Sequence, residues 1–450
     1  MHVEVALQPS SAATAEQVRP LIIALFASQV GGGGGGGHLL DGVELDLSSN
    51  PQLAAHVKHA RVFDVPASGI GPAAASTSFE PIVHVHPLFD EEAAEEDAGD
   101  GESVAFQLFT LPSLEFDGLW ESLVYDDEVQ PRLLRYVSTA MAFSHAGVDS
   151  RVIAWNRVVL LHGPPGTGKT SLCRGLAHKL AIRLSSQYCQ GHLVEVNAHS
   201  LFSKWFSESG KMVMHMFARI RELLEDGDAF VCVLVDEVES LAATRNASGG
   251  GGEPSDAIRV VNALLTQLDQ LKRYSNALVL TTSNLTGAID AAFIDRADIK
   301  QYIGHPGPAA RYQILRSCVH ELGRVGLVAP FDPLADVATL RSMLPYHTPT
   351  FEDLMAVPTE GSDAALQAAS RYSMLLYAVA EACEGLSGRA LRKLPFLAHA
   401  LFGADGSGGG GGGGGSTHGG LPIERYLVAL RRAVEHERGA RDAMGQNHET

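Results

Sequence analysis

The sequence predicts an α/β protein in which helices flank a parallel β-sheet. A small α+β region precedes the sheet, and a helical lid follows it. Three observations lead to this prediction. First, the apolar run Val158–Leu161 leads through a glycine-rich loop into a helix-compatible run. Second, another apolar run, Phe230–Val235, ends in two carboxylates. Third, the chain after His305 consists mainly of helix-compatible segments.

The glycine-rich loop matches the P-loop pattern of a glycine, four residues and then Gly-Lys-Thr. Glycines let the backbone turn tightly enough for successive N–H groups to converge on phosphate oxygens, and the helix start presents its positive end to the same anion. We therefore expect ATP here, with Lys169 reaching the β- and γ-phosphates and the Thr170 hydroxyl on Mg²⁺. The alternative is a glycine-rich turn without a ligand. The expected nucleotide-binding residues are Gly163, Pro164, Pro165, Gly166, Thr167, Gly168, Lys169, Thr170 and Ser171.

Length and charge bound the possible functions. The chain has 450 residues, enough for two or three domains, and its formal charge is 34 − 52 = −18. This charge argues against a general binder of nucleic acids or of anionic membranes. No long apolar run suited to crossing a membrane is evident, and the five scattered cysteines fit a reducing compartment.

Residues 1–105 are expected to form the small α+β domain. Val3–Leu7, Val43–Leu47 and Ile82–His86 alternate as strands do, and Ala15–Ser28 has an apolar helical face. His84 and His86 would share one strand face, which is compatible with a metal site, but the absence of a third ligand favours an ordinary strand. The glycine tract 31–37 is expected to be a flexible insert and the acidic run 90–102 a solvated loop.

Residues 106–304 are expected to form the large nucleotide-binding domain. Trp120 and Tyr125 lie near its start, just upstream of the nucleotide core, where they could wrap an adenine ring or simply pack in the core. A helix is predicted over 127–143. Further strands are predicted at 193–197 and 277–284 and a helix at 254–271.

Two predicted strands, Phe230–Val235 and 277–284, end in polar side chains. Because ligands bind at the carboxyl edge of a parallel sheet, Asp236 is expected to hold Mg²⁺ through water and Glu237 to polarise the attacking water. Asn284 could orient that water, the alternative being a residue that caps the strand. An apolar run ending in Asp-Glu is common by itself, but downstream of a P-loop it is a specific signal.

Residues 305–450 are expected to form the helical lid. Helices are predicted over 309–322, 364–382, 387–401 and 421–441, with a glycine-rich insert at 406–420.

Four segments make the chain resemble the pachytene checkpoint protein 2 family of AAA+ ATPases, also called thyroid receptor-interacting protein 13. They are 203–211, 235–241, 295–304 and 385–396, and the resemblance is dense over 111–302 and 385–401. AAA+ proteins generally carry Arg-Pro-Gly-Arg at the position where this chain has Asp295-Arg296-Ala297-Asp298. In this departure from the general AAA+ pattern the chain resembles the pachytene checkpoint protein 2 family. The resemblance implies the AAA+ version of the predicted fold, with the N-terminal domain recognising substrate and adaptor.

The resemblance also assigns roles to residues. Lys169 with Thr170 and Asp236 with Glu237 correspond to the Walker A and Walker B pairs. Asn284 corresponds to sensor 1, and Arg389 to sensor 2, which would touch the γ-phosphate. Arg296 is the candidate arginine finger, supplied to the neighbouring subunit, although it is offset from the common AAA+ position. Trp205, followed by Phe206, would line the pore, the alternative being an anchor in the core.

The resemblance implies that the protein forms a homo-hexamer. This hexamer would convert closed HORMA-domain proteins to the open form by pulling on their N-terminal segment. A HORMA-like adaptor would assist, in spindle-checkpoint silencing and in control of meiotic chromosome axes and recombination. The protein would then act in the nucleus on chromosomes and in the cytoplasm or at the kinetochore. No direct contact with nucleic acid or membrane is expected.

Two other functions compete with protein remodelling. A nucleic-acid-directed AAA+ ATPase would be favoured by a pore rich in Lys and Arg, whereas this chain is acidic and has Trp205 and Phe206 there. An ATP-binding scaffold without turnover is disfavoured because Lys169, Glu237, Asn284 and Arg389 are all in place.

Overall fold

The computed structural model describes residues 1–31, 41–65, 81–97, 104–126, 128–149, 151–197, 209–240, 254–284, 289, 291–343, 350–356, 364–403 and 420–446. The predictions about Trp205, Phe206 and the glycine tracts 32–37 and 406–419 lie outside these residues. The chain divides into two compact units. The first contains Met1–Leu123, Gln130–Gly163 and Lys169–Tyr302, and the second contains Val124–Val129, Pro164–Gly168 and Ile303–Thr450.

The first unit begins with a three-stranded sheet in the order β2-β1-β3. Its elements are β1 (His2–Leu7), α1 (Ala15–Gly31), α2 (Pro51–His56), β2 (Val57–Phe63) and β3 (Ile82–His86). β1 pairs antiparallel with β2 and parallel with β3, and an apolar face of α1 packs on the sheet. The expected α+β character is therefore present, but the strand predicted at Val43–Leu47 forms only a bridge from Glu44 to Arg61, and β2 takes its place.

A seven-stranded sheet forms the body of the first unit, in the order β10-β6-β9-β8-β7-β5-β4. Its strands are β4 (Ala94–Asp97), β5 (Val104–Leu111), β6 (Val158–His162), β7 (Gln190–Asn197), β8 (Ala229–Asp236), β9 (Ala277–Ser283) and β10 (Ile299–Tyr302). The five strands from β10 to β7 run parallel, as the sequence predicts, whereas β5 and β4 are added antiparallel at one edge.

Two details differ from the sequence predictions. The acidic run is not a loop throughout, because β4 lies within it and pairs with β5. An edge strand can carry charged side chains without burying them, which is why acidity did not prevent strand formation. The expected domain boundary at residue 105 falls inside β5, so the large sheet begins before that boundary.

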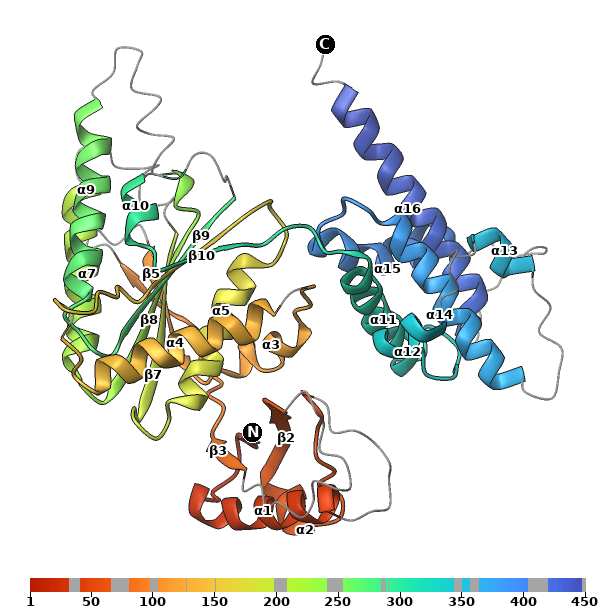
Figure 1. Cartoon of the computed structure of the whole chain (residues 1–450), viewed down its shortest axis with the longest axis horizontal. Coiled ribbons are helices and arrows are strands. Elements are labelled where there is room, and N and C mark those ends of the chain that lie inside the picture. Colours follow the sequence, from red (N-terminus) through yellow and green to blue (C-terminus); the bar gives the residue numbers. More distant parts are fainter. Residues whose placement is uncertain are drawn as a thin grey trace. The chain divides into compact units, whose positions relative to one another are not determined.

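Helices cover both faces of the large sheet (Figure 1). α7 (Ser209–Glu225) and α9 (Pro254–Leu271) lie side by side and share one apolar core with alternate residues of β8, namely Val231, Val233 and Val235. The P-loop helix α5 (Lys169–Arg183) contacts β7, β8 and β9 without joining that core, and so covers the opposite face. The remaining helices of this unit are η2 (Leu114–Phe116), α3 (Leu119–Ser122), α4 (Val129–His145) and α10 (Ala291–Arg296).

The second unit is helical. Its elements are α11 (Pro308–Arg324), α12 (Val337–Met343), α13 (Phe351–Ala356), α14 (Ala364–Ala382), α15 (Gly388–Phe402) and α16 (Ile423–Gln446). They enclose one apolar core, in which Tyr312 and Tyr426 are fully buried. The four long helices match the four that the sequence predicts, and the short α12 and α13 were not predicted. Among the described helices, none combines the length and apolar character needed to cross a membrane.

Candidate active site

The P-loop begins where β6 ends. Gly163, with φ 144°, leaves the strand while its N–H still donates to the Ser283 carbonyl, and Gly168 takes φ 92° just before α5. Side chains rarely tolerate such positive φ angles, so these turns require glycine. Lys169 is buried at the first position of α5, and its ammonium donates to the Gly163 carbonyl at 2.9 Å. The Lys169 ammonium is thereby held beside the residue that follows β6.

The Walker A threonine and the Walker B aspartate meet side by side. The Thr170 hydroxyl donates to both carboxylate oxygens of Asp236, at 3.0 and 3.2 Å. Thr170 comes from the first turn of α5 and Asp236 from the last position of β8, so the carboxyl edge of the sheet brings them together. A hydroxyl beside a carboxylate is a pair of hard oxygen ligands.

Glu237 follows immediately and has an unusual backbone. Its φ is 59°, in the left-handed region that non-glycine residues rarely occupy. Backbone strain of this kind concentrates at functional sites. The Glu237 N–H donates to the Thr282 hydroxyl at 3.2 Å, and the same hydroxyl donates to Asp236. The turn that carries the two carboxylates is therefore attached to the neighbouring strand β9.

Asn284 stands directly after β9 on the same edge. Its N–H donates to Oε1 of Glu239 at 3.0 Å, which links the residue after β9 to the chain that follows β8. Of the predicted site residues, the structure thus brings together Lys169, Thr170, Asp236, Glu237 and Asn284 within the first unit.

Within the second unit, the loop Pro164–Gly168 lies against the start of α15. The Arg389 N–H donates to the Gly166 carbonyl at 3.0 Å, and a Cβ atom at Gly166, where φ is 75°, would come within 2.8 Å of the Ser387 hydroxyl. Ser387 caps α15 by accepting from the Ala390 N–H. The first turn of the lid helix, with the proposed sensor 2 arginine, is therefore adjacent to the phosphate-binding loop.

The two aromatic residues Trp120 and Tyr125 have different surroundings. Trp120 is buried and packs on Gly175 of α5, so it belongs to the core. Tyr125 instead donates its hydroxyl to the Gly168 carbonyl at 3.3 Å, which places it at the P-loop. Tyr125 is therefore the aromatic residue of this pair that lies by the nucleotide-binding residues.

Arg296 lies at the end of α10 and forms an ion pair within the same chain. Its guanidinium donates to Asp269 of α9, with Nη2 at 2.7 Å from Oδ2, and to the Ala292 carbonyl. A role as a finger toward a neighbouring subunit stays a prediction. Trp205 and Phe206 lie outside the described residues.

Sequence reasoning missed Thr282 and Glu239. Thr282 sits two residues before Asn284 in Thr281-Thr282-Ser283-Asn284, and Glu239 two residues after Glu237. Polar residues at the carboxyl end of a buried strand were the available signal. Neither assignment follows from the chain order alone, because both contacts depend on the pairing of β8 with β9.

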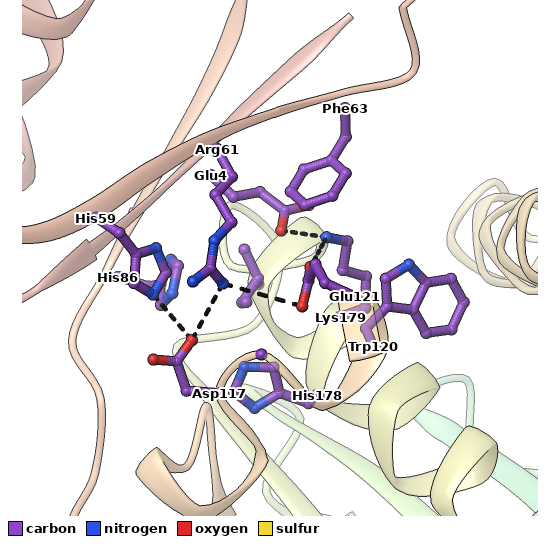
Figure 2. A pocket seen from close by; sticks show the side chains of 12 residues that line it. Glu4, His59, Arg61, Phe63, His86, Asp117, Trp120, Glu121, His178 and Lys179 are labelled. Atoms are coloured by element: carbon purple, nitrogen blue, oxygen red, sulfur yellow. Dashed lines mark hydrogen bonds and ion pairs between the residues drawn. The ribbon is translucent and has the colours of Figure 1, made fainter. Parts of the chain in front are cut away.

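A second polar cluster joins the small N-terminal sheet to the other end of α5 (Figure 2). Glu4 of β1 is buried and accepts from Lys179 at 2.6 Å and from Arg183 at 2.8 Å. Asp117, beside η2, accepts from Lys58 and His59 of β2 at 2.7 and 2.8 Å. The helix that carries Lys169 and Thr170 at its start is thus bound to the N-terminal sheet at its end.

Burial and charge set the protonation states in this cluster. Burial alone would raise the pKa of Glu4, but Lys179 and Arg183 outweigh it and hold that pKa below its usual value. Burial lowers the pKa of His86 to about 3 and that of His178 to about 4, so both imidazoles are neutral at pH 7. Within the described parts of the chain, no group of three or more potential metal ligands occurs, here or around His84.

Comparison with known proteins places this site in a family. The model described as "ATPase family associated with various cellular activities (AAA)" matches residues 159–305, and that described as "TRIP13-like, AAA+ ATPase lid C-terminal domain" matches 307–438. A pachytene checkpoint protein 2 homolog from Oryza sativa subsp. indica is 48% identical over 402 residues, which is 88% of this chain and 82% of the relative. The chain belongs to the pachytene checkpoint protein 2 family.

Further relatives of this family agree. The Xenopus tropicalis homolog is 50% identical over 370 residues, covering 81% of this chain and 78% of its own. A solved structure of C. elegans PCH-2 has a TM-score of 0.70 and 31% identity, and covers 97% of this chain and 99% of that one. The AAA+ fold and ATPase activity predicted from the sequence are confirmed. The residues described above are therefore the candidate ATP site of this ATPase, and their individual roles stay predictions.

Proposed function

We propose that this chain works as a homo-hexamer that uses ATP hydrolysis to convert closed HORMA-domain proteins to the open form, with a HORMA-like adaptor. The proposal is supported by family membership together with the position of Thr170, Asp236, Glu237 and Asn284 at one edge of the sheet. An ATP-binding scaffold would have no need for a glutamate in a fixed turn directly after Asp236. A role in checkpoint silencing and meiotic chromosome axes, in the nucleus and at kinetochores, follows from the same proposal.

Mg²⁺ is the metal that fits the proposal. The Thr170 hydroxyl and the Asp236 carboxylate are oxygen ligands of the kind Mg²⁺ prefers. These two residues would hold the ion, directly or through water. The bound ion would neutralise charge on the β- and γ-phosphates.

The chain's own residues divide the remaining work in this proposal. Lys169 and the backbone N–H groups of the loop hold the phosphates, Glu237 takes a proton from the attacking water, and Asn284 orients that water. Arg389 from the lid and Arg296 from a neighbouring subunit stabilise charge on the γ-phosphate. Trp205 and Phe206 grip the client in the pore by steric contact and stacking.

The test compares ATP hydrolysis alone with hydrolysis in the presence of a closed HORMA-domain protein and its adaptor. Stimulation only when both are present supports the proposal, and an unchanged rate contradicts it. Trp205→Ala serves as the matched variant, because it leaves the hydrolytic residues intact. It should keep the basal rate and lose the stimulation, and a Trp205→Ala protein that is stimulated normally would refute gripping by this residue.

A further inference from the structure

Thr282 occupies a position between the two Walker B carboxylates and the strand that carries sensor 1. β8 ends at Asp236, whereas β9 continues to Ser283, and the last strand pair between them is Val235 with Thr281. Beyond that pair, the Thr282 carbonyl accepts from the Val238 N–H at 3.0 Å. Thr282 therefore extends the connection between the two strands past the end of the regular ladder.

The Thr282 hydroxyl makes two bonds at once. It donates to Oδ1 of Asp236 and accepts from the Glu237 N–H at 3.2 Å. A hydroxyl can donate one hydrogen bond and accept others through its lone pairs, so the Thr282 hydroxyl can make both bonds at once. Thr282 is buried, so within this fold water is a poor substitute for either bond.

The first bond holds the side-chain carboxylate of Asp236, and the second holds the N–H of the peptide that joins Asp236 to Glu237. That peptide fixes the directions in which the two side chains leave the backbone, and Glu237 leaves it from a strained left-handed conformation with φ 59°. Strain persists only where neighbouring groups hold it, and the Thr282 hydroxyl holds this N–H directly. We propose that Thr282 is a positioning residue for ATP hydrolysis, whose hydroxyl sets the orientation of Asp236 and Glu237.

The matched control lies one residue earlier on the same strand. Thr281 is also buried, and its hydroxyl donates to the Val159 carbonyl of β6 at 3.0 Å, not to the Walker B residues. Thr281→Val and Thr282→Val each replace a buried hydroxyl with a methyl group of similar size. Only the second change removes a bond to Asp236 and Glu237.

The experiment measures kcat, KM and affinity for a fluorescent ATP analogue in three variants. Thr282→Val should lower kcat by about 10- to 100-fold with nucleotide affinity within about threefold of wild type, because small misplacements of catalytic groups cost rates of this order. Thr282→Ser, which keeps the hydroxyl, should recover most of kcat, and Thr281→Val should keep it. If Thr282→Val does not fold, Thr282→Ala replaces it in the same comparison.

Hydrogen exchange supplies a readout that does not depend on turnover. The Glu237 amide should exchange faster in Thr282→Val than in wild type or in Thr281→Val, since its acceptor is gone. A wild-type kcat in Thr282→Val, an equal loss in Thr281→Val, failure of Thr282→Ser to recover the rate, or unchanged exchange at Glu237 would each overturn the proposal.

Discussion

In the proposed mechanism, Glu237 is the residue on which hydrolysis most directly depends. Its backbone is fixed by the Thr282 hydroxyl, and the Glu237 carbonyl in turn accepts from the Ser240 hydroxyl at 2.7 Å. Glu237 therefore lies in a short turn that is held on both sides, directly after Asp236. A general base has to be held within reach of the proton it removes, and a fixed backbone limits the positions that its side chain can take.

Glu237→Gln should keep ATP binding and lower the hydrolysis rate by at least about 10²-fold, because the amide cannot take the proton from water. Lys169→Ala should lose ATP binding as well. Titration with a fluorescent ATP analogue and measurement of phosphate release separate the two effects. Glu225→Gln, an exposed glutamate at the end of α7, is the control that should behave as wild type. Near-normal hydrolysis by Glu237→Gln would show that Glu237 is not the catalytic base.

At the scale of elements, α5 connects two parts of the first unit. Its first residues are the ones proposed to hold phosphate, and its last turn is bound to the N-terminal sheet through Glu4, Lys179 and Arg183. The Lys179 ammonium also lies over the Phe63 ring, 3.1 Å from the centroid. Because these charges are buried, they stabilise the junction only while every partner is present.

Glu4→Gln should lower the free energy of unfolding of this unit by about 1–3 kcal/mol, because it removes the buried counter-ion of Lys179 and Arg183 and leaves them with the more exposed carboxylates of Glu121 and Asp64. Chemical denaturation followed by circular dichroism measures the change. Glu16→Gln changes an exposed glutamate on α1 and should have little effect. Equal stability of the Glu4→Gln and Glu16→Gln proteins would contradict a structural role for the cluster.

The buried histidines predict a dependence on pH. In the unfolded chain an imidazole titrates near pH 6.5, whereas burial lowers the pKa of His86 to about 3 in the folded state. Between these values the unfolded state binds more protons, so stability is lost as the pH falls from about 6.5 toward 3. The melting temperature should therefore fall between pH 7 and pH 5. The fall should be smaller in His86→Gln but unchanged in His56→Gln, whose histidine is exposed. Equal slopes in all three proteins would contradict this origin.

The candidate site could be located from the sequence because its determinants are local. A strand, a loop and a helix place Lys169 and Thr170, and a strand ending places Asp236 and Glu237, without knowledge of distant contacts. The roles of Thr282 and Glu239 could not be predicted, since they arise from the pairing of β8 with β9.

The same reasoning explains the errors in the fold. β2 escaped prediction because it does not alternate cleanly, with buried residues next to one another at His59-Ala60 and Val62-Phe63. β4 escaped because edge strands tolerate charge. In both cases the neighbouring strand, and not the segment's own pattern, decides the structure.

At the scale of the whole molecule, the proposed hydrolysis of ATP between neighbouring subunits of the ring depends on Arg296. In the single chain its guanidinium pairs with Asp269, which is partly exposed, so the arginine would have to exchange this partner for a phosphate of the next subunit. Arg296→Ala should bind ATP normally and hydrolyse it about 10³-fold more slowly. Asp269→Asn should keep hydrolysis, because it removes only the partner within the chain.

Mixed rings decide whether the arginine acts between subunits. A subunit with Arg296→Ala keeps Glu237, and a subunit with Glu237→Gln keeps Arg296, so some interfaces in a mixture contain both groups. Hydrolysis should therefore rise above that of either variant alone, with a maximum at intermediate ratios. Absence of any rise, at every ratio, would count against Arg296 as a finger supplied in trans.

The most direct measurement follows the conversion of a closed HORMA-domain protein to its open form by ion-exchange chromatography, with adaptor and ATP present. Wild-type protein should convert the client in proportion to the ATP it hydrolyses, and Glu237→Gln should bind the client in ATP without converting it. Conversion by Glu237→Gln at the wild-type rate, or continued hydrolysis by wild type with the client unchanged, would contradict the proposed ATP-driven remodelling.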